Sequence, residues 1–510
     1  MGIWTKKPLN LILSEASNEE KGLKRSLGPM ALISLGIGAI IGAGLFVRTA
    51  AGAAEHAGPS VTIGFIIAAI GCAFAGLCYA ELSSSIPISG SAYTYSFATM
   101  GEMVAWIIGW DLVLEYAVGA SMVGIAWSEY LNNLLVNVLH LPGIPYDLCH
   151  SPIPSKVPII GPDGKELVIN GVTQVKELPG GIINLPALGI VVALTQLLVR
   201  GIKESAVINN IIVVAKVAIV IMLIVFGWQF INPAHHTPYV PEPSLFVNAQ
   251  GIQHDFGGWL GIIGAAGVVF FAFIGFDAVS TAAQEAKNPN RDMPIGILGS
   301  LAICTVLYIL FAHVLTGLAP VEFFRSAGKE ASVAQAIATY MPGYGWLSSL
   351  ITVAILAGFS SVILVMLMGQ SRVFYSMSKD GLLPARFAEL HPKFRTPANA
   401  NYFVMILVGL VAAFVPGDIV GDMSSIGTLF AFILVCAGVI ILRKTEPNLV
   451  RRFRTPLVPV VPILGIVFCL AMMVGLGWVN WLRLVVWLLI GMVIYFGYSR
   501  KHSRIGNPEA

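Results

Sequence analysis

Long apolar segments separated by short polar connections make up most of the chain. A helix needs about 20 mostly apolar residues to cross a lipid bilayer. Twelve segments come close to this requirement, at 29–50, 60–83, 103–128, 182–200, 205–230, 259–284, 294–317, 346–375, 400–415, 419–442, 459–479 and 481–499. We number them spans 1 to 12 in chain order. The pattern predicts an all-α membrane protein with twelve transmembrane helices.

The composition strengthens this prediction and excludes other classes of protein. Of the 510 residues, 56% are hydrophobic and only 11% are charged, whereas about 25% of a soluble domain is charged. The net charge of +3 is too small to indicate nucleic-acid binding. Most cysteines lie within apolar spans, and Cys149 lies alone in a loop. We therefore expect no disulfide framework.

The distribution of basic residues predicts the orientation in the membrane. An even number of spans places both ends of the chain on one side. Lysine and arginine concentrate in the two tails and in the loops on their side, whereas the opposite side holds only Arg48, Lys156, Lys165, Lys176, Arg325, Lys329 and Arg483. Because basic loops remain in the cytoplasm, we expect cytoplasmic tails at 1–28 and 500–510 and a location in the cell (inner) membrane. The polar stretch 1–28 has no signal-peptide pattern.

We expect the connections between spans to contain no soluble domain. The longest external connection, at about 135–181, is rich in proline and glycine and is predicted to be irregular. The region 320–345, between spans 7 and 8, is expected to form one or two short lid-like helices.

Two spans contain sequences that interrupt a helix. Within span 1, the stretch 35–46 has glycine at positions 36, 38, 42 and 44, and each glycine weakens a helix by roughly 1 kcal/mol. Such glycines also allow two membrane helices to pack closely. Within span 6, Gly275 lies directly before Phe276 and Asp277. Paired interruptions in corresponding halves of a chain are typical of a transporter binding site.

The positions of the two interruptions divide the chain into two halves of five spans. Spans 1 to 5 cover 29–230 and spans 6 to 10 cover 259–443, so each half begins with an interrupted span. An odd number of spans per half inverts the second half relative to the first. The transporter core is therefore expected at 29–443, with spans 11 and 12 at 444–499 as peripheral helices.

Lys216 lies in the middle of span 5, with no acidic residue within ten positions along the chain. Placing an ionisable side chain inside a membrane span costs roughly 2.5–3.5 kcal/mol, so such a residue usually has a structural or functional role. Lys216 is either a structural lysine bonded to carbonyls or a cation that gains and loses a proton. Ser360 and Ser361 in span 8 are candidates to meet it, although such hydroxyls often bond to the preceding helical turn.

Three acidic residues are further candidates. Asp111 and Glu115 are four positions apart in span 3, so they share one helix face, and Glu115 is a candidate for handling a proton or the solute. Asp277 follows the break in span 6, where it would cap the next half-helix or act in gating. His313 in span 7 is expected to be a packed, hydrogen-bonded side chain.

Signatures of enzymes are missing from the sequence. It contains no His-Glu-x-x-His, no Gly-x-Ser-x-Gly and no phosphate-binding Gly-x-x-x-x-Gly-Lys-Ser/Thr motif. We therefore expect no enzymatic activity, no cofactor, no metal ligand and no ATP-driven pumping by this chain.

Several stretches together resemble the amino acid–polyamine–organocation superfamily and, within it, bacterial members of the cationic amino acid transporter family. The resemblance extends from about residue 27 to 500. It includes Gly-Ile-Gly-Ala-Ile-Ile-Gly-Ala-Gly-Leu-Phe at 36–46, Cys-Tyr-Ala-Glu-Leu at 78–82, Pro-Ile-Ser-Gly-Ser-Ala-Tyr at 87–93, Gly-Trp-Asp-Leu-Val-Leu-Glu-Tyr at 109–116, Ala-Phe-Ile-Gly-Phe-Asp at 272–277, Lys-Asn-Pro at 287–289 and Lys-Asp-Gly-Leu-Leu-Pro at 379–384.

The resemblance implies the five-plus-five inverted repeat known from LeuT, working by alternating access. It places the substrate carboxylate on the amides of Gly42, Ala43 and Gly44. The carbonyls of Ile40 and Ile274 would bind the α-amino group. Flanking positions complete the expected site, namely Ile41, Phe270 and Ala272.

The resemblance also assigns two individual roles. Phe271 would be an aromatic gate over the substrate. Lys216 would occupy the place that a sodium ion holds between spans 1, 5 and 8 in sodium-coupled members, with Glu115, Ser360 and Ser361 as further candidates for proton coupling.

The function expected from these features is sodium-independent, proton-coupled uptake of cationic and/or neutral L-amino acids. The expected partners are an L-amino acid, protons and the lipid bilayer, and the oligomeric state stays open. An amino-acid exchanger of the same fold is the alternative. A solute channel and a non-transporting nutrient sensor are more distant ones.

Overall fold

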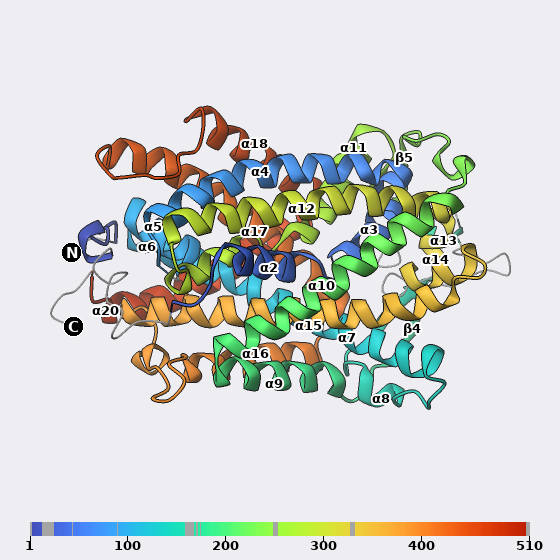
Figure 1. The fold of residues 1–510 in the computed structure, drawn as a ribbon, viewed down its shortest axis with the longest axis horizontal. Helices are drawn as coiled ribbons and strands as arrows, with labels where there is room; N and C mark the ends of the chain where they lie inside the picture. Colours follow the sequence, from blue (N-terminus) through green and yellow to red (C-terminus); the bar gives the residue numbers. More distant parts are fainter. Residues whose placement is uncertain are drawn as a thin grey trace.

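The structure is a computed structural model that describes residues 3–12, 25–42, 44–88, 90–158, 168–169, 172–173, 175–247, 253–326 and 332–505. Long helices lie side by side along the longest axis of the molecule (Figure 1). Both ends of the chain lie at the same end of this bundle (Figure 1). The short strands lie toward the opposite end, which we call the strand end.

Helices occupy most of each predicted span. In the first half they are α2 (Pro29–Ile40), α4 (Val61–Ser85), α6 (Glu102–Val113), α7 (Gly119–Asn133), α9 (Leu185–Arg200) and α10 (Ile202–Gly227). A single π-helical turn, η4 (Leu114–Val118), joins α6 to α7. The rest of the chain contributes α11 (Gly258–Phe270), α12 (Pro289–Leu318), α15 (Gly345–Lys379), α16 (Ala398–Phe414), α17 (Gly417–Thr445), α18 (Val460–Gly475) and α19 (Trp478–Ile494).

The helices confirm a multi-pass membrane protein. Within the described ranges, eight helices are long and apolar enough to cross a membrane, and four shorter apolar helices accompany them. Many leucine, isoleucine and valine side chains on their outer faces are exposed, among them Val225, Ile406 and Val493. Exposed apolar side chains on this scale suit contact with lipid rather than water.

The connections at the strand end are more ordered than the sequence suggested. Within 135–181, the helix α8 (Tyr146–Cys149) precedes β1 (Ser155–Pro158), β2 (Val168–Ile169), β3 (Val172–Thr173) and β4 (Val175–Leu178). β1 pairs antiparallel with β4, and β2 with β3. The prediction of an irregular loop was therefore wrong for these segments, because pairing of β1 with β4 and of β2 with β3 provides hydrogen-bond partners for their backbone groups.

Three further connections carry regular structure. The strands β5 (Ser244–Val247) and β6 (Gln253–Phe256), which the sequence analysis did not predict, form an antiparallel pair before α11. The short helices α13 (Val321–Ser326) and α14 (Ser332–Tyr340) fall in the region where lid-like helices were predicted. At the end with the chain termini, α5 (Ser91–Thr99) lies between spans 2 and 3.

Both predicted helix interruptions are present. α2 ends at Ile40, and Ile41 adopts an extended backbone with ψ of 102°. The helix resumes with η1 (Gly44–Arg48), α3 (Thr49–Gly52) and η2 (Ala53–Ala57). In span 6, α11 leads into the 3-10 turn η8 (Phe271–Phe273), and the chain then continues as η9 (Asp277–Glu285). Gly275 between them has φ of +114°, a conformation that other residues adopt only with strain.

The interrupted first span lies at the centre of the bundle. α2 packs against α10, α12 and α15, which surround it in Figure 1. Glycines allow this close approach, since a Cβ at Gly36 would lie 2.3 Å from Ser300 Oγ and one at Gly38 would lie 2.4 Å from Asn209 Oδ1. These two glycines therefore serve helix packing, and the break itself lies further along the chain.

Candidate functional site

Lys216 is completely buried and joins three helices. From α10, its Nζ donates hydrogen bonds to the carbonyls of Gly38 at 2.9 Å and Ile41 at 2.8 Å, and to Ser361 Oγ at 2.8 Å. An ammonium group has three protons to donate, so these acceptors satisfy it fully. Two of the acceptors belong to the C-terminal end of α2, where the helix dipole favours a positive charge. The structure thus brings together spans 1, 5 and 8 at one cation.

Ser361 and Ser360 have different surroundings, although they are adjacent. Ser361 Oγ lies 2.9 Å from the carbonyl of Gly38 as well as close to Lys216. Ser360 Oγ instead donates to the carbonyl of Leu356 at 2.8 Å and accepts from Trp127 Nε1 at 3.0 Å. The recorded hydrogen bonds of Ser360 are directed away from Lys216, so the prediction that it could share the lysine site is not supported by the geometry.

The two breaks touch each other. A Cβ on Gly44 would lie only 2.2 Å from Ala272 Cα, and one on Gly42 would lie 2.4 Å from Val362 Cγ2. Only glycine fits at position 44 without moving the backbone of the second break. Ala43 lies outside the described residues.

Tyr308 is a residue of this site that the sequence analysis missed. It lies fully buried in α12, and its hydroxyl is 2.7 Å from the carbonyl of Ile40 and 2.9 Å from that of Ala272. Where a membrane helix is unwound, backbone carbonyls lose their helical hydrogen bonds and need another donor. The hydroxyl of Tyr308 lies close to two carbonyls of this kind, one in each break. A tyrosine in the middle of an apolar span was the available signal, because its buried hydroxyl requires a partner.

The aromatic residues of the second break point in different directions. Phe271 is 4% exposed, and the guanidinium of Arg48 lies 5.3 Å from its ring centre. Phe270 packs edge-on against Phe432 of α17, with ring centres 5.7 Å apart. Ile274 is buried beside them and has an extended backbone. Of Phe270 and Phe271, Phe271 is the one with a recorded contact to the first span, through Arg48.

Asp277 forms hydrogen bonds with the second break and with span 3. Its Oδ1 accepts from the amide of Gly275 at 3.2 Å, and its Oδ2 accepts from the hydroxyl of Tyr116. The recorded backbone donor to Asp277 thus precedes η9 in the chain, and capping of this half-helix or a gating role stays a prediction.

Glu115 and Asp111 lie near Asp277 in the bundle interior. All three side chains are fully buried, and Glu115 is close enough to both other carboxyl groups to interact with them electrostatically. The carboxyl oxygens of Glu115 and Asp111 have no hydrogen-bond partner among the described residues. Ionisable residues are expensive inside a membrane bundle and usually mark a functional site.

A cluster of polar contacts closes the end of the bundle that holds the chain termini. Glu285 pairs with Arg372 at 3.0 Å, with both side chains buried. The Nζ of Lys7 lies 2.6 Å from Asp380 Oδ1, and Tyr93 donates to the other oxygen of Asp380 at 2.7 Å. These contacts tie the N-terminal segment to α5 and to the end of α15.

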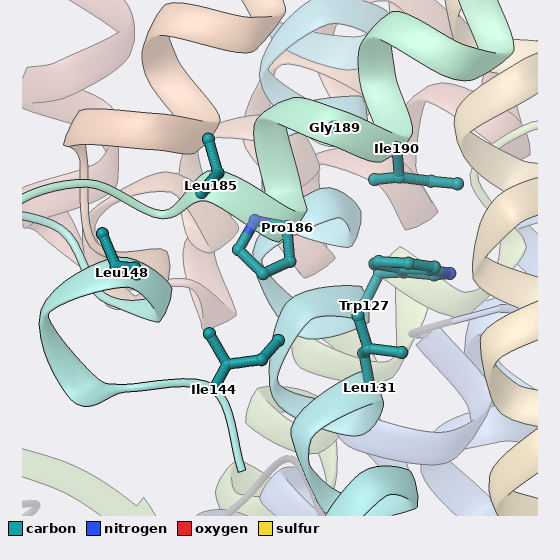
Figure 2. A pocket seen from close by; sticks show the side chains of 8 residues that line it. All are labelled: Trp127, Leu131, Ile144, Leu148, Leu185, Pro186, Gly189 and Ile190. Atoms are coloured by element: carbon teal, nitrogen blue, oxygen red, sulfur yellow. The ribbon is translucent and has the colours of Figure 1, made fainter. Parts of the chain in front are cut away.

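An apolar cavity of about 420 Å³ lies elsewhere, between α7 and α9. Figure 2 shows the side chains that line it, which are Trp127, Leu131, Ile144, Leu148, Leu185, Pro186, Gly189 and Ile190. None of these residues belongs to either break, and the lining offers almost no polar group for the charged ends of an amino acid. The cavity is therefore separate from the site at the breaks.

Comparison with known proteins identifies the family of this chain. Residues 27–499 match the family described as amino acid permease. This chain belongs to the amino acid permease family. The match confirms the resemblance found in the sequence motifs and covers every helix of the bundle.

The names of individual relatives refer to several different substrates. The chain is 43% identical over 504 residues to the branched-chain amino acid permease BcaP of Bacillus subtilis (strain 168), covering 99% of each protein. It is 40% identical over 502 residues to the methylthioribose transporter of the same organism, covering 98% of each. The vacuolar cationic amino acid transporter 4 of Arabidopsis thaliana is 31% identical over 426 residues, or 84% of this chain and 64% of that protein.

Proposed function

We propose that this permease is a secondary active transporter that takes up neutral, aliphatic L-amino acids together with protons and without sodium. It would use twelve transmembrane helices in a LeuT-like arrangement, with both termini in the cytoplasm. The observation that carries the proposal is the ammonium of Lys216, bonded to the carbonyls of Gly38 and Ile41 and to Ser361. A sodium ion would need the same kind of oxygen ligands at this junction.

The two breaks supply the groups that an amino acid needs. The amides at 42–44 begin a helical segment, where a carboxylate gains charge-assisted hydrogen bonds and a favourable dipole. The carbonyls of Ile40 and Ile274 would accept bonds from the α-amino group. Tyr308 is placed to release the carbonyl of Ile40 when the amino group binds, because one hydroxyl proton can serve only one of its two neighbouring carbonyls at a time.

The side-chain preference is inferred from the residues against the first break. The side chain of Val362 lies against Gly42, and the ring of Phe271 lies beside Arg48 of the first span. Apolar walls favour aliphatic side chains by removing them from water. The branched-chain permease of Bacillus subtilis, the relative with 43% identity, supports the same preference.

A second substrate class is favoured by a specific observation. Glu115 is buried and has no hydrogen-bond partner among the described residues, so it could receive the distal charge of a cationic amino acid. Competition by leucine, isoleucine, lysine, arginine and methylthioribose against one radiolabelled amino acid in proteoliposomes separates these possibilities. We expect the aliphatic amino acids to compete best.

Proton coupling follows from a difference between two states of Lys216. The ammonium holds α2 to α10 and α15 through its three hydrogen bonds. Loss of the proton removes donors from this junction and lets the first span separate from the other helices. Coupling requires that the two conformations bind the proton with different affinity, since a ligand bound equally by both shifts no equilibrium.

Uptake into sodium-free proteoliposomes, with and without an imposed pH step, tests the proposal. We expect an inward proton gradient to stimulate uptake by the wild type. Lys216→Ala should lose this stimulation, and Lys216→Arg should lose it too, because arginine keeps its charge and cannot release the proton. Sodium-dependent uptake by the wild type, or proton-driven accumulation by Lys216→Ala, would contradict the mechanism.

The adjacent serines provide a matched control for the same measurement. Ser361→Ala removes one acceptor from the ammonium and should lower proton-stimulated uptake by about tenfold, since hydrogen bonds to charged groups contribute roughly 1.5–3 kcal/mol. Ser360→Ala should leave it unchanged. An obligatory exchanger would instead show uptake only when substrate is present inside the vesicles.

A further inference from the structure

Two histidines and a glutamate from distant parts of the chain meet near the strand end. Glu55 and His56 lie on η2, in the segment that follows the first break. His254 lies on β6, shortly before α11 and the second break. One ligand atom of each residue lies within 4.8 Å of the others. The rings of His56 and His254 are arranged edge to face, with centres 4.7 Å apart.

We propose that Glu55, His56 and His254 form a binding site for a transition-metal dication such as Zn²⁺. Imidazole nitrogens with one carboxylate oxygen are a common protein ligand set for zinc. Three protein ligands leave the fourth tetrahedral position to water. The inference does not depend on which solute the permease transports.

Binding of Zn²⁺ by these three residues would require only a small movement of their side chains. Tetrahedral Zn²⁺, with ligand bonds of about 2.0–2.1 Å, holds its ligand atoms about 3.3 Å apart. Glu55 and His254 are each only partly buried, so rotation of their side chains can close the remaining separation. His56 is the fixed member of the group, since it is 4% exposed.

Glycines at the start of α11 and within it hold His56 in place. The amide of Gly257 donates to the carbonyl of His56 at 2.7 Å. A Cβ at Gly261 would lie 2.4 Å from that carbonyl oxygen, and one at Gly264 would lie 2.6 Å from His56 Nδ1. His56 therefore occupies space that a residue larger than glycine at 261 or 264 would fill. These contacts fix its position before any metal binds.

Arg325 of α13 joins the two elements that carry the ligands. Its Nε donates to the carbonyl of Ala54 on η2 at 2.8 Å. Its guanidinium also lies 4.5 Å from the ring centre of Phe246 and 4.6 Å from that of Phe256, on the β5–β6 pair. The ligands from η2 and β6 are thus held near each other by contacts that do not involve a metal. A bound metal would add a second link between the outer parts of spans 1 and 6.

Metal binding by the full-length protein in detergent tests the site directly. The protein is purified without a polyhistidine tag, stripped with a chelator and dialysed against Zn²⁺ or Co²⁺. We expect one Zn²⁺ per chain and, for Co²⁺, the visible absorption of a tetrahedral nitrogen–oxygen site. His56→Gln, His254→Gln and Glu55→Gln should each weaken the affinity by at least about tenfold, since even loss of a residue that only supports a ligand costs 10–100-fold.

Two other histidines serve as controls. His235 and His236 lie on η7 (Pro233–His236), and neither belongs to the group of three. His235→Gln and His236→Gln should bind Zn²⁺ as the wild type does. His254 is partly exposed on a strand, so His254→Gln is the variant expected to remain folded, with retained amino-acid uptake as the check. The proposal would be overturned if the double variant His56→Gln/His254→Gln bound Zn²⁺ as well as the wild type does. It would also be overturned if the control variants lost Zn²⁺ binding to the same extent as the site variants.

Discussion

At the scale of single residues, the hydroxyl of Tyr308 contacts both breaks. Its hydroxyl lies between the carbonyls of Ile40 and Ala272, one from each break. Tyr308→Phe preserves the ring but leaves both carbonyls without this donor. A buried group that loses its partner costs about 1–3 kcal/mol. We therefore expect a lower apparent melting temperature in a thermal-shift measurement, with a weaker affinity for the transported amino acid.

An exposed tyrosine of α16 provides the comparison for this change. Tyr402 is exposed, and its hydroxyl is 3.5 Å from Gln196 Oε1. Tyr402→Phe should alter neither melting temperature nor affinity. If Tyr308→Phe behaves in the same way, the hydroxyl does not stabilise the breaks.

At the scale of helices, a larger residue at either glycine of the first break would clash, but with a different neighbour at each position. A Cβ on Gly42 meets the side chain of Val362, whereas a Cβ on Gly44 meets the backbone of Ala272. A side chain can be shortened by a second mutation, and a backbone cannot. We expect Gly42→Ala and Gly44→Ala both to weaken substrate binding, and the corresponding valine variants to abolish it while the protein still inserts into the membrane.

A second mutation distinguishes the clash with the Val362 side chain from the clash with the Ala272 backbone. Val362→Ala should restore binding to Gly42→Ala but not to Gly44→Ala, measured by equilibrium binding of a radiolabelled amino acid. Gly189 of α9 has open space around its Cβ position, so Gly189→Ala should bind normally. Wild-type affinity in Gly44→Ala would remove the substrate site from this break.

At the scale of the whole molecule, the N-terminal segment belongs to the folded bundle. Lys7 is 4% exposed, and its Nζ forms an ion pair with Asp380 at the end of α15. Its amide also donates to the carbonyl of Phe97 on α5. Sequence analysis treated 1–28 as a tail, but these contacts close one end of the transporter. An opening of this end during transport would have to separate them.

Removal of the lysine tests how much this contact stabilises the protein. Lys7→Ala leaves Asp380 as a buried charge without its cation, which typically costs about 3–5 kcal/mol. We expect a clear fall in apparent melting temperature for Lys7→Ala and a smaller one for Lys7→Ala/Asp380→Ala. The neighbouring Lys6 is exposed, so Lys6→Ala should have no effect. Equal stability of Lys6→Ala and Lys7→Ala would contradict this role.

The sequence alone determined the features that depend on local composition. Apolar length predicted the helices, and glycine at 42, 44 and 275 predicted where two of them stop. An isolated lysine in an apolar span indicated that position 216 has a special role. Each of these features follows from the energy of a short segment in lipid, which neighbours along the chain largely set. The motifs added the family, and the inverted repeat and the twelve crossings stay predictions.

Only the tertiary structure decided which side chains meet. Ser360 and Ser361 are adjacent, but successive residues on a helix point about 100° apart, so helix rotation selects Ser361 for Lys216. The pairing of β1 with β4, the contact of Lys7 with Asp380 and the grouping of His56 with His254 join positions that are not neighbours in the sequence. Their proximity depends on how the helices pack, because the short-range pattern of each segment carries no information about its partner.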